Sequence, residues 1–207
     1  MISHRTRRGR LHKVEVRQQY LGSNTSYGFR YTPMDRTVGK EGILEVIPEE
    51  AAVVRQMFHW VDQEGLSARQ VLFRLNERGI TPRKGAATWA KSSVLRILHN
   101  EMYAGVWYYN KHRSCEPERS SHDQPRYRRH NKSSNRYRPK GEWIAVALPD
   151  TLRVIERPQW AGVQEQLQKN ISFSPRHEKH SYLLKSLVQC AGCGRRYVGE
   201  PGHGRFY

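Results

Sequence analysis

Three amphipathic helical patterns follow one another between residues 48 and 100, and they constrain the fold more than any other feature of the chain. The first begins at Pro48, a residue suited to the first turn of a helix, and ends at Gly65. Its apolar residues recur at helical spacing: Val53, Val54, Met57, Phe58 and Val61. The sequence therefore predicts a folded body with helices at its centre.

The second pattern begins at Ser67, which can form a capping box with Gln70, and it stops at Gly79. Its inward-facing residues are Ala68, Val71, Leu72 and Leu75. The third pattern lies within residues 88–100 and turns Val94, Ile97 and Leu98 to one side. The two helices are joined by a turn that is longer than usual, and together they predict a helix-turn-helix.

A helix-turn-helix braces one helix on the core and offers the polar face of the other to base edges in the major groove of DNA. The third pattern carries such a face in Lys91, Ser92, Arg96 and His99. Arg83 and Lys84 in the turn are placed to hold phosphates. The alternative is a face that is only solvated, because consecutive amphipathic helices occur in most helical domains.

Short strands are predicted on both sides of these helices. Residues 42–48 alternate as a strand does, and residues 106–109 and 142–148 are two further strand candidates. Residues 157–170 form another amphipathic helical pattern, whereas residues 23–33 are rich in turn-forming residues. This mixture of helices and short strands predicts an α+β fold.

Positive charge dominates the composition, with 36 Lys and Arg against 19 Asp and Glu, a formal net charge of +17. Residues 1–17 hold a net +5 and residues 113–141 a net +6, while the middle of the chain is nearly balanced. Such an excess favours a polyanionic partner. Because arginine greatly outnumbers lysine in both arms, the pattern favours DNA over an anionic membrane.

The two basic arms each leave an alternative open. The first holds Arg5, Arg7, Arg8, Arg10 and Lys13, which can follow a minor groove, or it is a disordered basic tail or a targeting segment. Residues 113–141 have no apolar period and predict a mobile loop. The tyrosines of this loop, Tyr127 and Tyr137, alternate with arginines and can equally stack on the bases of single-stranded RNA.

Cys190 and Cys193 form a Cys-x-x-Cys followed by Gly194, as in one knuckle of a zinc ribbon. A ribbon takes its other two ligands from a second Cys-x-x-Cys about 15–20 residues further on, and the sequence ends at Tyr207 without one. His203 is a weak candidate for a third ligand. We therefore expect zinc as a possible cofactor with an incomplete set of ligands.

The cysteine usage, two of three in a Cys-x-x-Cys, indicates a reducing compartment rather than a disulfide framework. The sequence has no run of 18 apolar residues and no secretory signal, so we expect a cytoplasmic protein without a membrane partner. Catalytic motifs are missing too: no Gly-rich phosphate loop, no His-Glu-x-x-His and no paired carboxylates for metals. If the chain is whole, the residues alone predict a binding protein rather than an enzyme.

Five stretches, in order and at matching spacing, resemble the recombinase domain and zinc ribbon of large serine recombinases, the phage integrases and related transposon recombinases. They are YGFRY (27–31), GILEVIPEEAAVVRQMF (42–58), GLSARQVLFRLNERGITPRKG (65–85), TWAKSSVLRILHNEMYAGVWYYNK (88–111) and CAGCGRRY (190–197). In addition, ISHRTRRGRLHK (2–13) is similar to the end of the long helix that joins the catalytic and DNA-binding domains in that family.

The resemblance implies a domain order. Residues 1–22 would be the end of the linking helix and basic arm, and 23–170 the helix-turn-helix-containing DNA-binding domain. A linker, 171–181, would precede a truncated zinc ribbon, 182–207. The serine nucleophile of the family lies in an N-terminal catalytic domain, and no residue here matches it. We therefore expect this chain to bind one half of a DNA attachment site without cutting it.

In the family, that binding serves site-specific DNA integration and excision in bacteria, phages and other mobile elements. An intact recombinase subunit is a further expected partner, since this chain could occupy half-sites beside it. The alternative function is a stand-alone basic protein associated with RNA or the ribosome, which would bind through its two arms without sequence preference.

Overall fold

The structure is a computed structural model that describes residues 2–22, 25–34, 37, 39, 42–83, 85–115, 134–172, 187–195, 197, 201–202 and 205–206. Five α-helices lie within these residues: α1 (Ile2–Glu15), α2 (Pro48–Asp62), α3 (Ala68–Glu77), α4 (Lys91–Leu98) and α5 (Arg157–Ser172). The described strands are β1 (Phe29–Thr32), β2 (Ile43–Val46), β3 (Val106–Tyr109), β4 (His112–Cys115), β5 (Ser134–Tyr137), β6 (Ile144–Ala147), β7 (Pro201–Gly202) and β8 (Arg205–Phe206). Short 3-10 helices are η1 (Glu101–Ala104), η3 (Lys140–Glu142) and η4 (Asp150–Leu152). The predicted α+β fold is confirmed.

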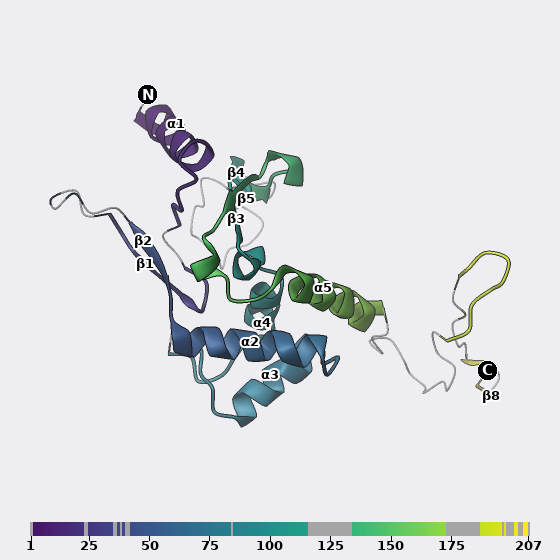
Figure 1. Cartoon of the computed structure of the whole chain (residues 1–207). Coiled ribbons are helices and arrows are strands. Elements are labelled where there is room, and N and C mark those ends of the chain that lie inside the picture. The colour runs from purple at the N-terminus through teal and green to yellow at the C-terminus, as the bar shows by residue number, and fades with distance from the viewer. Residues whose placement is uncertain are drawn as a thin grey trace, which may run out of the picture.

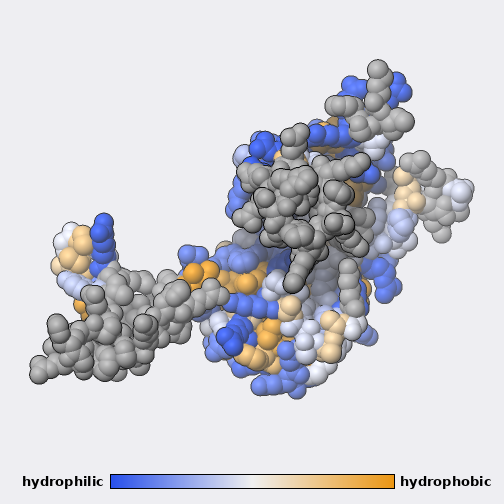
Figure 2. Space-filling model, turned by 180° about the vertical axis from the view of Figure 1, so that it is seen from behind, coloured by the Kyte–Doolittle hydropathy of each residue, from blue (hydrophilic) through white to orange (hydrophobic). Residues whose placement is uncertain are grey.

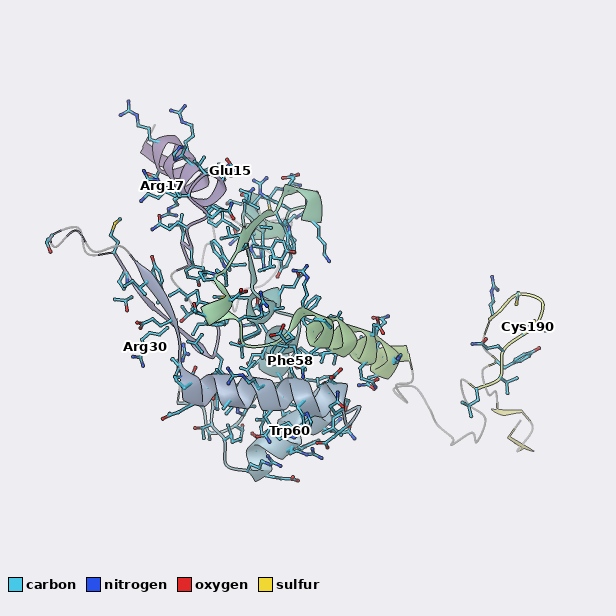
Figure 3. All side chains as sticks on the ribbon, viewed as in Figure 1. Glu15, Arg17, Arg30, Phe58, Trp60 and Cys190 are labelled. Atoms are coloured by element: carbon cyan, nitrogen blue, oxygen red, sulfur yellow. The ribbon has the colours of Figure 1, made fainter. Side chains whose placement is uncertain are left out.

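Helix α2 lies at the centre of the body, with α3 on one side and α4 and α5 on the other (Figure 1). The two faces of α2 point toward different helices: Phe58 points toward the α5 side and Trp60 toward α3 (Figure 3). Helix α5 approaches α2 so closely at Gly162 that an added Cβ would lie 2.9 Å from Asp62 Oδ1. The predicted apolar stripes of these helices form most of the buried core, while Val53 and Leu72 are partly buried and pack against it.

The helices begin where the sequence predicts. Pro48 is in the first turn of α2, and the capping box of α3 is formed: Gln70 N donates to Ser67 Oγ over 3.4 Å, and Ser67 N to Gln70 Oε1 over 2.8 Å. Gly79 follows α3 with a φ of +65°, a backbone conformation that disfavours other residues. Local signals of this kind act within one turn of helix, which is why the sequence alone reveals them.

The strands pair two by two as antiparallel ladders, β1 with β2, β3 with β6, β4 with β5, and β7 with β8. Residues 29–32 were expected to be turn, and that prediction is wrong: they form β1, which extends from the body with β2 as a hairpin (Figure 1). Residues 113–141 were expected to be a mobile loop. This prediction is wrong at both ends of the segment, because β4 and β5 pair there. The part of that loop between residues 116 and 133 lies outside the described residues.

Tyr103 ties the strand region to the helical body. It is fully buried, stacks on Phe29 with ring centroids 5.5 Å apart, and donates its hydroxyl to the carbonyl of Tyr27 over 2.6 Å. Burial strongly raises the pKa of its hydroxyl, so the group stays a neutral donor. Helix α1 is attached through the fully buried Val14 and contacts β6.

No helix among the described residues combines the length and the apolar content needed to span a bilayer.

Candidate nucleic-acid interface

Helix α4 separates an apolar and a polar face. Val94 and Leu98 are fully buried and Ile97 nearly so, which fixes the orientation of the helix against the core. Lys91, Ser92, Arg96 and His99, the polar residues expected from the sequence, are all exposed. The structure thus gathers these four side chains on the outer side of one short helix.

The C-terminal end of α4 is held by α5. Gln164 donates its Nε2 to the carbonyl of Leu98 over 2.8 Å, and its Oε1 lies 2.6 Å from His99 Nδ1. A single side chain therefore satisfies an unpaired carbonyl at the helix end and positions the imidazole. The polar face of α4 is set by packing on one side and by this hydrogen bond at its end.

The stretch from residue 78 to residue 100 contains no Asp or Glu. A net charge summed over the whole middle of the chain conceals this feature. The stretch holds five cationic residues: Arg78, Arg83, Lys84, Lys91 and Arg96. Within it, Lys91 and Arg96 are exposed cations that can attract phosphates, whereas Arg83 is paired with Glu50 from another part of the chain. Counting charges in a shorter window would have found this stretch.

Arg83 makes hydrogen bonds to two other segments of the fold. Its Nε donates to Glu50 Oε1 over 2.8 Å, a second guanidinium nitrogen pairs with Glu50 Oε2, and a third lies 3.3 Å from Thr25 Oγ1. The hydrogen bond with Glu50 raises the pKa of Arg83 further. Its phosphate role stays a prediction, and the neighbouring Lys84 lies outside the described residues.

Glu50 is the acceptor for this turn and for the start of β1. Burial alone would raise the pKa of its carboxyl, but the hydrogen bonds from Arg83 and from the N–H of Gly28, 2.6 Å away, outweigh burial and lower the pKa. Gly28 has a φ of +94°, which favours glycine there. The carboxylate joins three segments that are far apart in the sequence.

The turn between α3 and α4 is anchored by Trp89, which is nearly fully buried. Its Nε1 donates to the carbonyl of Ile80 over 2.9 Å, and its N–H to Asn76 Oδ1 over 3.1 Å. The ring also meets Tyr27 edge to face at 5.0 Å. A long turn held in this way fixes α4 relative to α3.

The cations of α1 form a separate group. Arg5, Arg7, Arg8 and Arg10 are exposed, and Lys13 is half-buried. Helix α1 lies at the opposite end of the molecule from α3 (Figure 1), and hydrophilic residues cover much of its surface in Figure 2. The structure does not bring this arm into one cluster with the polar face of α4.

The two cysteines expected to bind metal lie at a tight turn. Gly194 N donates to the carbonyl of Cys190 over 2.8 Å, and Cys190 N to the carbonyl of Arg195 over 2.8 Å. The backbone N–H groups of Cys193 and Gly192 point at the Cys190 sulfur and lower the pKa of its thiol. This suits a thiolate ligand, but the described residues contain no group of three or more His, Cys, Asp or Glu that could hold a metal ion, and His203 lies outside them. The zinc assignment stays a prediction.

Comparisons with solved structures identify the same fold elsewhere. A structure titled "Crystal Structure of a LSR-DNA Complex" aligns with 98% of this chain and 51% of that chain, at a TM-score of 0.55 and 19% identity. A second, from "Sequence Requirements of the Listeria innocua prophage attP site", aligns with 98% of this chain and 70% of that chain, at a TM-score of 0.56 and 17% identity. At these identities the likeness concerns the fold.

Sequence comparison identifies the family. A "Putative DNA recombinase" of Bacillus subtilis (strain 168) is 29% identical over 219 residues, which cover 100% of this chain and 39% of the relative. The chain thus spans about two fifths of the length of this relative. A family model described as Recombinase matches residues 48–170, more than half of the chain. This protein therefore belongs to the Recombinase family, as its resemblance to the large serine recombinases predicted.

Proposed function

We propose that this chain binds duplex DNA, with α3 and α4 acting as a helix-turn-helix and the outer face of α4 entering the major groove. The observation that carries the proposal is the exposed face of Lys91, Ser92 and Arg96 on a helix whose opposite face is buried. Lysine and arginine at such positions hydrogen-bond to guanine edges, and serine to several bases. The structural neighbour titled as an LSR-DNA complex supports this assignment.

The basic arm on α1 would supply binding without sequence preference. Its exposed arginines, with one acidic residue in the helix, are available to contact phosphates. Each lost phosphate contact makes the slope of log affinity against log salt concentration less steep by about 1. Substituting these arginines should therefore weaken binding to every duplex alike.

The biological role we propose is recognition of one half of an attachment site in site-specific recombination. The support is the family, together with the attP study named for one structural neighbour. An intact recombinase subunit is a further partner that we propose for this role, and the family supports it. In this role the chain contributes affinity and site choice.

For the C-terminal turn we propose half of a zinc site. Cys190 and Cys193 would supply two thiolates, and a complete tetrahedral site needs two further ligands from outside the described residues. Bound zinc would stabilise the turn and supply no chemistry to strand exchange. Metal analysis of purified protein tests this, and we expect less than one tightly held zinc per chain.

The experiment that tests DNA recognition is fluorescence anisotropy with a labelled attachment-site half and a shuffled duplex of equal length. Lys91→Gln combined with Arg96→Gln should weaken binding to the site by roughly 10- to 100-fold and reduce its preference over the shuffled duplex. The control, Arg30→Gln, removes an exposed charge from the β1–β2 hairpin and should change both affinities by less than about 3-fold.

Equal loss of affinity on both duplexes would contradict base recognition by α4. Binding that is lost only with the α1 arginines, and that prefers no duplex sequence, would instead favour the stand-alone RNA-binding alternative.

A further inference from the structure

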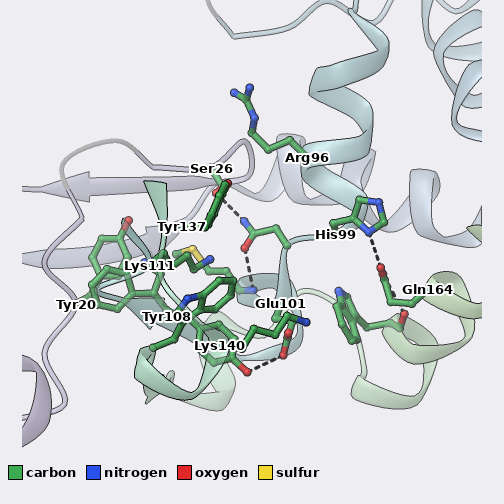
Figure 4. Close-up of a pocket in the computed structure, with 15 residues that line it drawn as sticks. Tyr20, Ser26, Arg96, His99, Glu101, Tyr108, Lys111, Tyr137, Lys140 and Gln164 are labelled. Carbon is green, nitrogen blue, oxygen red and sulfur yellow. Dashed lines mark hydrogen bonds between the residues drawn. The ribbon is translucent and has the colours of Figure 1, made fainter. Parts of the chain in front are cut away.

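A cavity of about 600 Å³ lies beside the end of α4, and its wall includes residues of α4, α5, β3 and β5 (Figure 4). Arg96 and His99 of α4 border one side of it, and Tyr108, Lys111 and Lys140 gather on the other. Its size is in the range of pockets that hold small molecules or single nucleotides. The duplex-binding function proposed above uses Arg96 of this wall and none of its other described residues.

Aromatic rings form much of the cavity wall. Tyr108 meets Trp143 edge to face at 5.7 Å, and Tyr137 lies 6.3 Å from Trp143. Tyr137 is 70% exposed although it lines the cavity and its ring centroid lies 4.3 Å from that of His112. In a duplex the base faces are stacked on one another, so such a ring gains most from a base that has left the stack.

Positive charge converges on the same cavity. The ammonium of Lys111 lies over the rings of both Tyr108 and Trp143, 5.5 and 5.3 Å from their centroids. Burial lowers the pKa of Lys111, so its charge is costly there and an incoming anion would offset that cost. Among the described residues of the wall, Glu101 is the one carboxylate, and it already accepts a hydrogen bond from Tyr108 over 3.0 Å.

A second cleft, of about 540 Å³, adjoins the cavity and shares Tyr108 and Lys111 with it. Its lining includes Arg7 of α1, Arg113 of β4 and Arg138, and none of its described lining residues is a carboxylate. A chain of phosphates leaving the cavity would therefore meet Arg7 and Arg113, beside an Arg138 that already pairs with Glu142 over 2.6 Å. The two hollows together offer a stacking site followed by a phosphate path, the combination that single-strand binding proteins use.

We propose that this cavity binds one unstacked nucleotide of a DNA strand, with its base against Tyr137 and its phosphate near Lys111, while the neighbouring phosphates follow the adjoining cleft. This activity is separate from the reading of duplex DNA by α4 and does not depend on it. It would let the protein hold a strand that has been opened or frayed beside its duplex site.

The test is fluorescence anisotropy of the full chain with fluorescein-labelled (dT)8, competed by a blunt hairpin duplex, (rU)8, free dTMP or inorganic phosphate. Tyr137→Ser should weaken binding of (dT)8 by roughly 5- to 100-fold, because the stacking ring is lost. Tyr137→Phe keeps the ring and should stay within about 2-fold of the unmodified chain. Lys111→Gln should weaken (dT)8 and also flatten its salt dependence.

Tyr197→Ser is the matched control, since Tyr197 is also exposed but lies in the C-terminal segment and not in the cavity wall. The proposal is overturned if Tyr137→Ser behaves like Tyr197→Ser, or if the hairpin duplex displaces (dT)8 as well as unlabelled (dT)8 does. A preference for (rU)8 of more than about 10-fold would overturn the assignment to DNA. Displacement of (dT)8 by dTMP but not by inorganic phosphate would support base stacking in the cavity, because only dTMP carries a base.

Lys91→Gln separates this proposal from duplex recognition. Lys91 does not line the cavity, so this variant should bind (dT)8 normally while losing affinity for the attachment-site duplex. Normal duplex binding with no (dT)8 binding would sink the cavity proposal and leave the duplex proposal intact.

Discussion

The turn between α3 and α4 and the outer face of α4 belong to the same acid-free stretch of sequence, yet the structure uses their cations differently. In the turn, Arg83 is paired with Glu50 and lies 5.9 Å from the ring centre of Tyr27. On α4, Lys91 and Arg96 are exposed. One cation holds the body together, and the other two are presented outward.

The difference shows that a positive charge in a sequence does not reveal whether it is available to a ligand. The partner of Arg83 lies 33 positions upstream, and only the packing of α2 against the turn brings the two together. The exposed residues on α4 need no such contact, because their orientation follows from the apolar residues of the same helix. The comparison predicts that stability and DNA affinity can be changed separately.

The largest expected effect is on the turn itself. Trp89→Ala removes a buried ring and its hydrogen bond to Ile80, and should lower the free energy of unfolding by about 3–5 kcal/mol. Lys91→Ala, two residues away and exposed, should change it by less than about 0.5 kcal/mol while weakening duplex binding. Urea denaturation measures both changes. Similar losses of stability for the two variants would contradict the prediction that stability and DNA affinity can be changed separately.

A smaller effect is expected at the carboxylate that anchors the turn. Glu50→Ala leaves Arg83 and the N–H of Gly28 without their acceptor and should cost about 2 kcal/mol, between the values for exposed and buried ion pairs. Glu49→Ala is the control: Glu49 is exposed in the same helical turn and should cost less than about 0.5 kcal/mol. Thermal denaturation of Glu50→Ala and Glu49→Ala measures the two losses of stability and shows whether they differ as expected.

The pH dependence of that contribution has a defined sign. Because the folded-state pKa of Glu50 lies below its ordinary value of 4.5, the stabilisation is fully present above about pH 4.5 and is lost as the pH falls through the folded-state pKa. The difference in Tm between the unmodified chain and Glu50→Gln should therefore be constant from about pH 5 to 7 and shrink toward pH 3. A difference that grew on acidification would contradict this assignment.

Helix positions could be predicted because their signals are local. The capping box of Ser67 and the glycine after α3 act within a few residues, and the apolar spacing of α4 identifies the face it buries. The four residues expected on the outer face of α4 are exposed for the same reason. Their role on DNA remains a prediction.

Strands β1, β4 and β5 were missed because their pairing depends on partners outside the local sequence. Phe29 is buried by Tyr103, which is 74 positions away, and β4 and β5 pair across the intervening basic segment. The cavity beside α4 was missed for the same reason, since α4, α5 and the strands meet there only in three dimensions. Tyr137 had been noted as a stacking residue, but nothing in the sequence placed it beside Lys111.

The smallest expected effect compares the same substitution at two tryptophans of that cavity. Trp143 donates its Nε1 to the carbonyl of Arg138 over 2.9 Å, whereas the buried Nε1 of Trp160 has no hydrogen-bond partner among the described residues. Trp143→Phe removes a hydrogen bond and should lower the free energy of unfolding by about 1 kcal/mol. Trp160→Phe removes an unsatisfied donor, which offsets the lost contacts of the larger ring, so a change of less than about 0.5 kcal/mol is expected. Equal losses in urea denaturation would mean that the Trp160 N–H has a partner in solution, such as an ordered water or a group in the part of the chain that the structure does not describe.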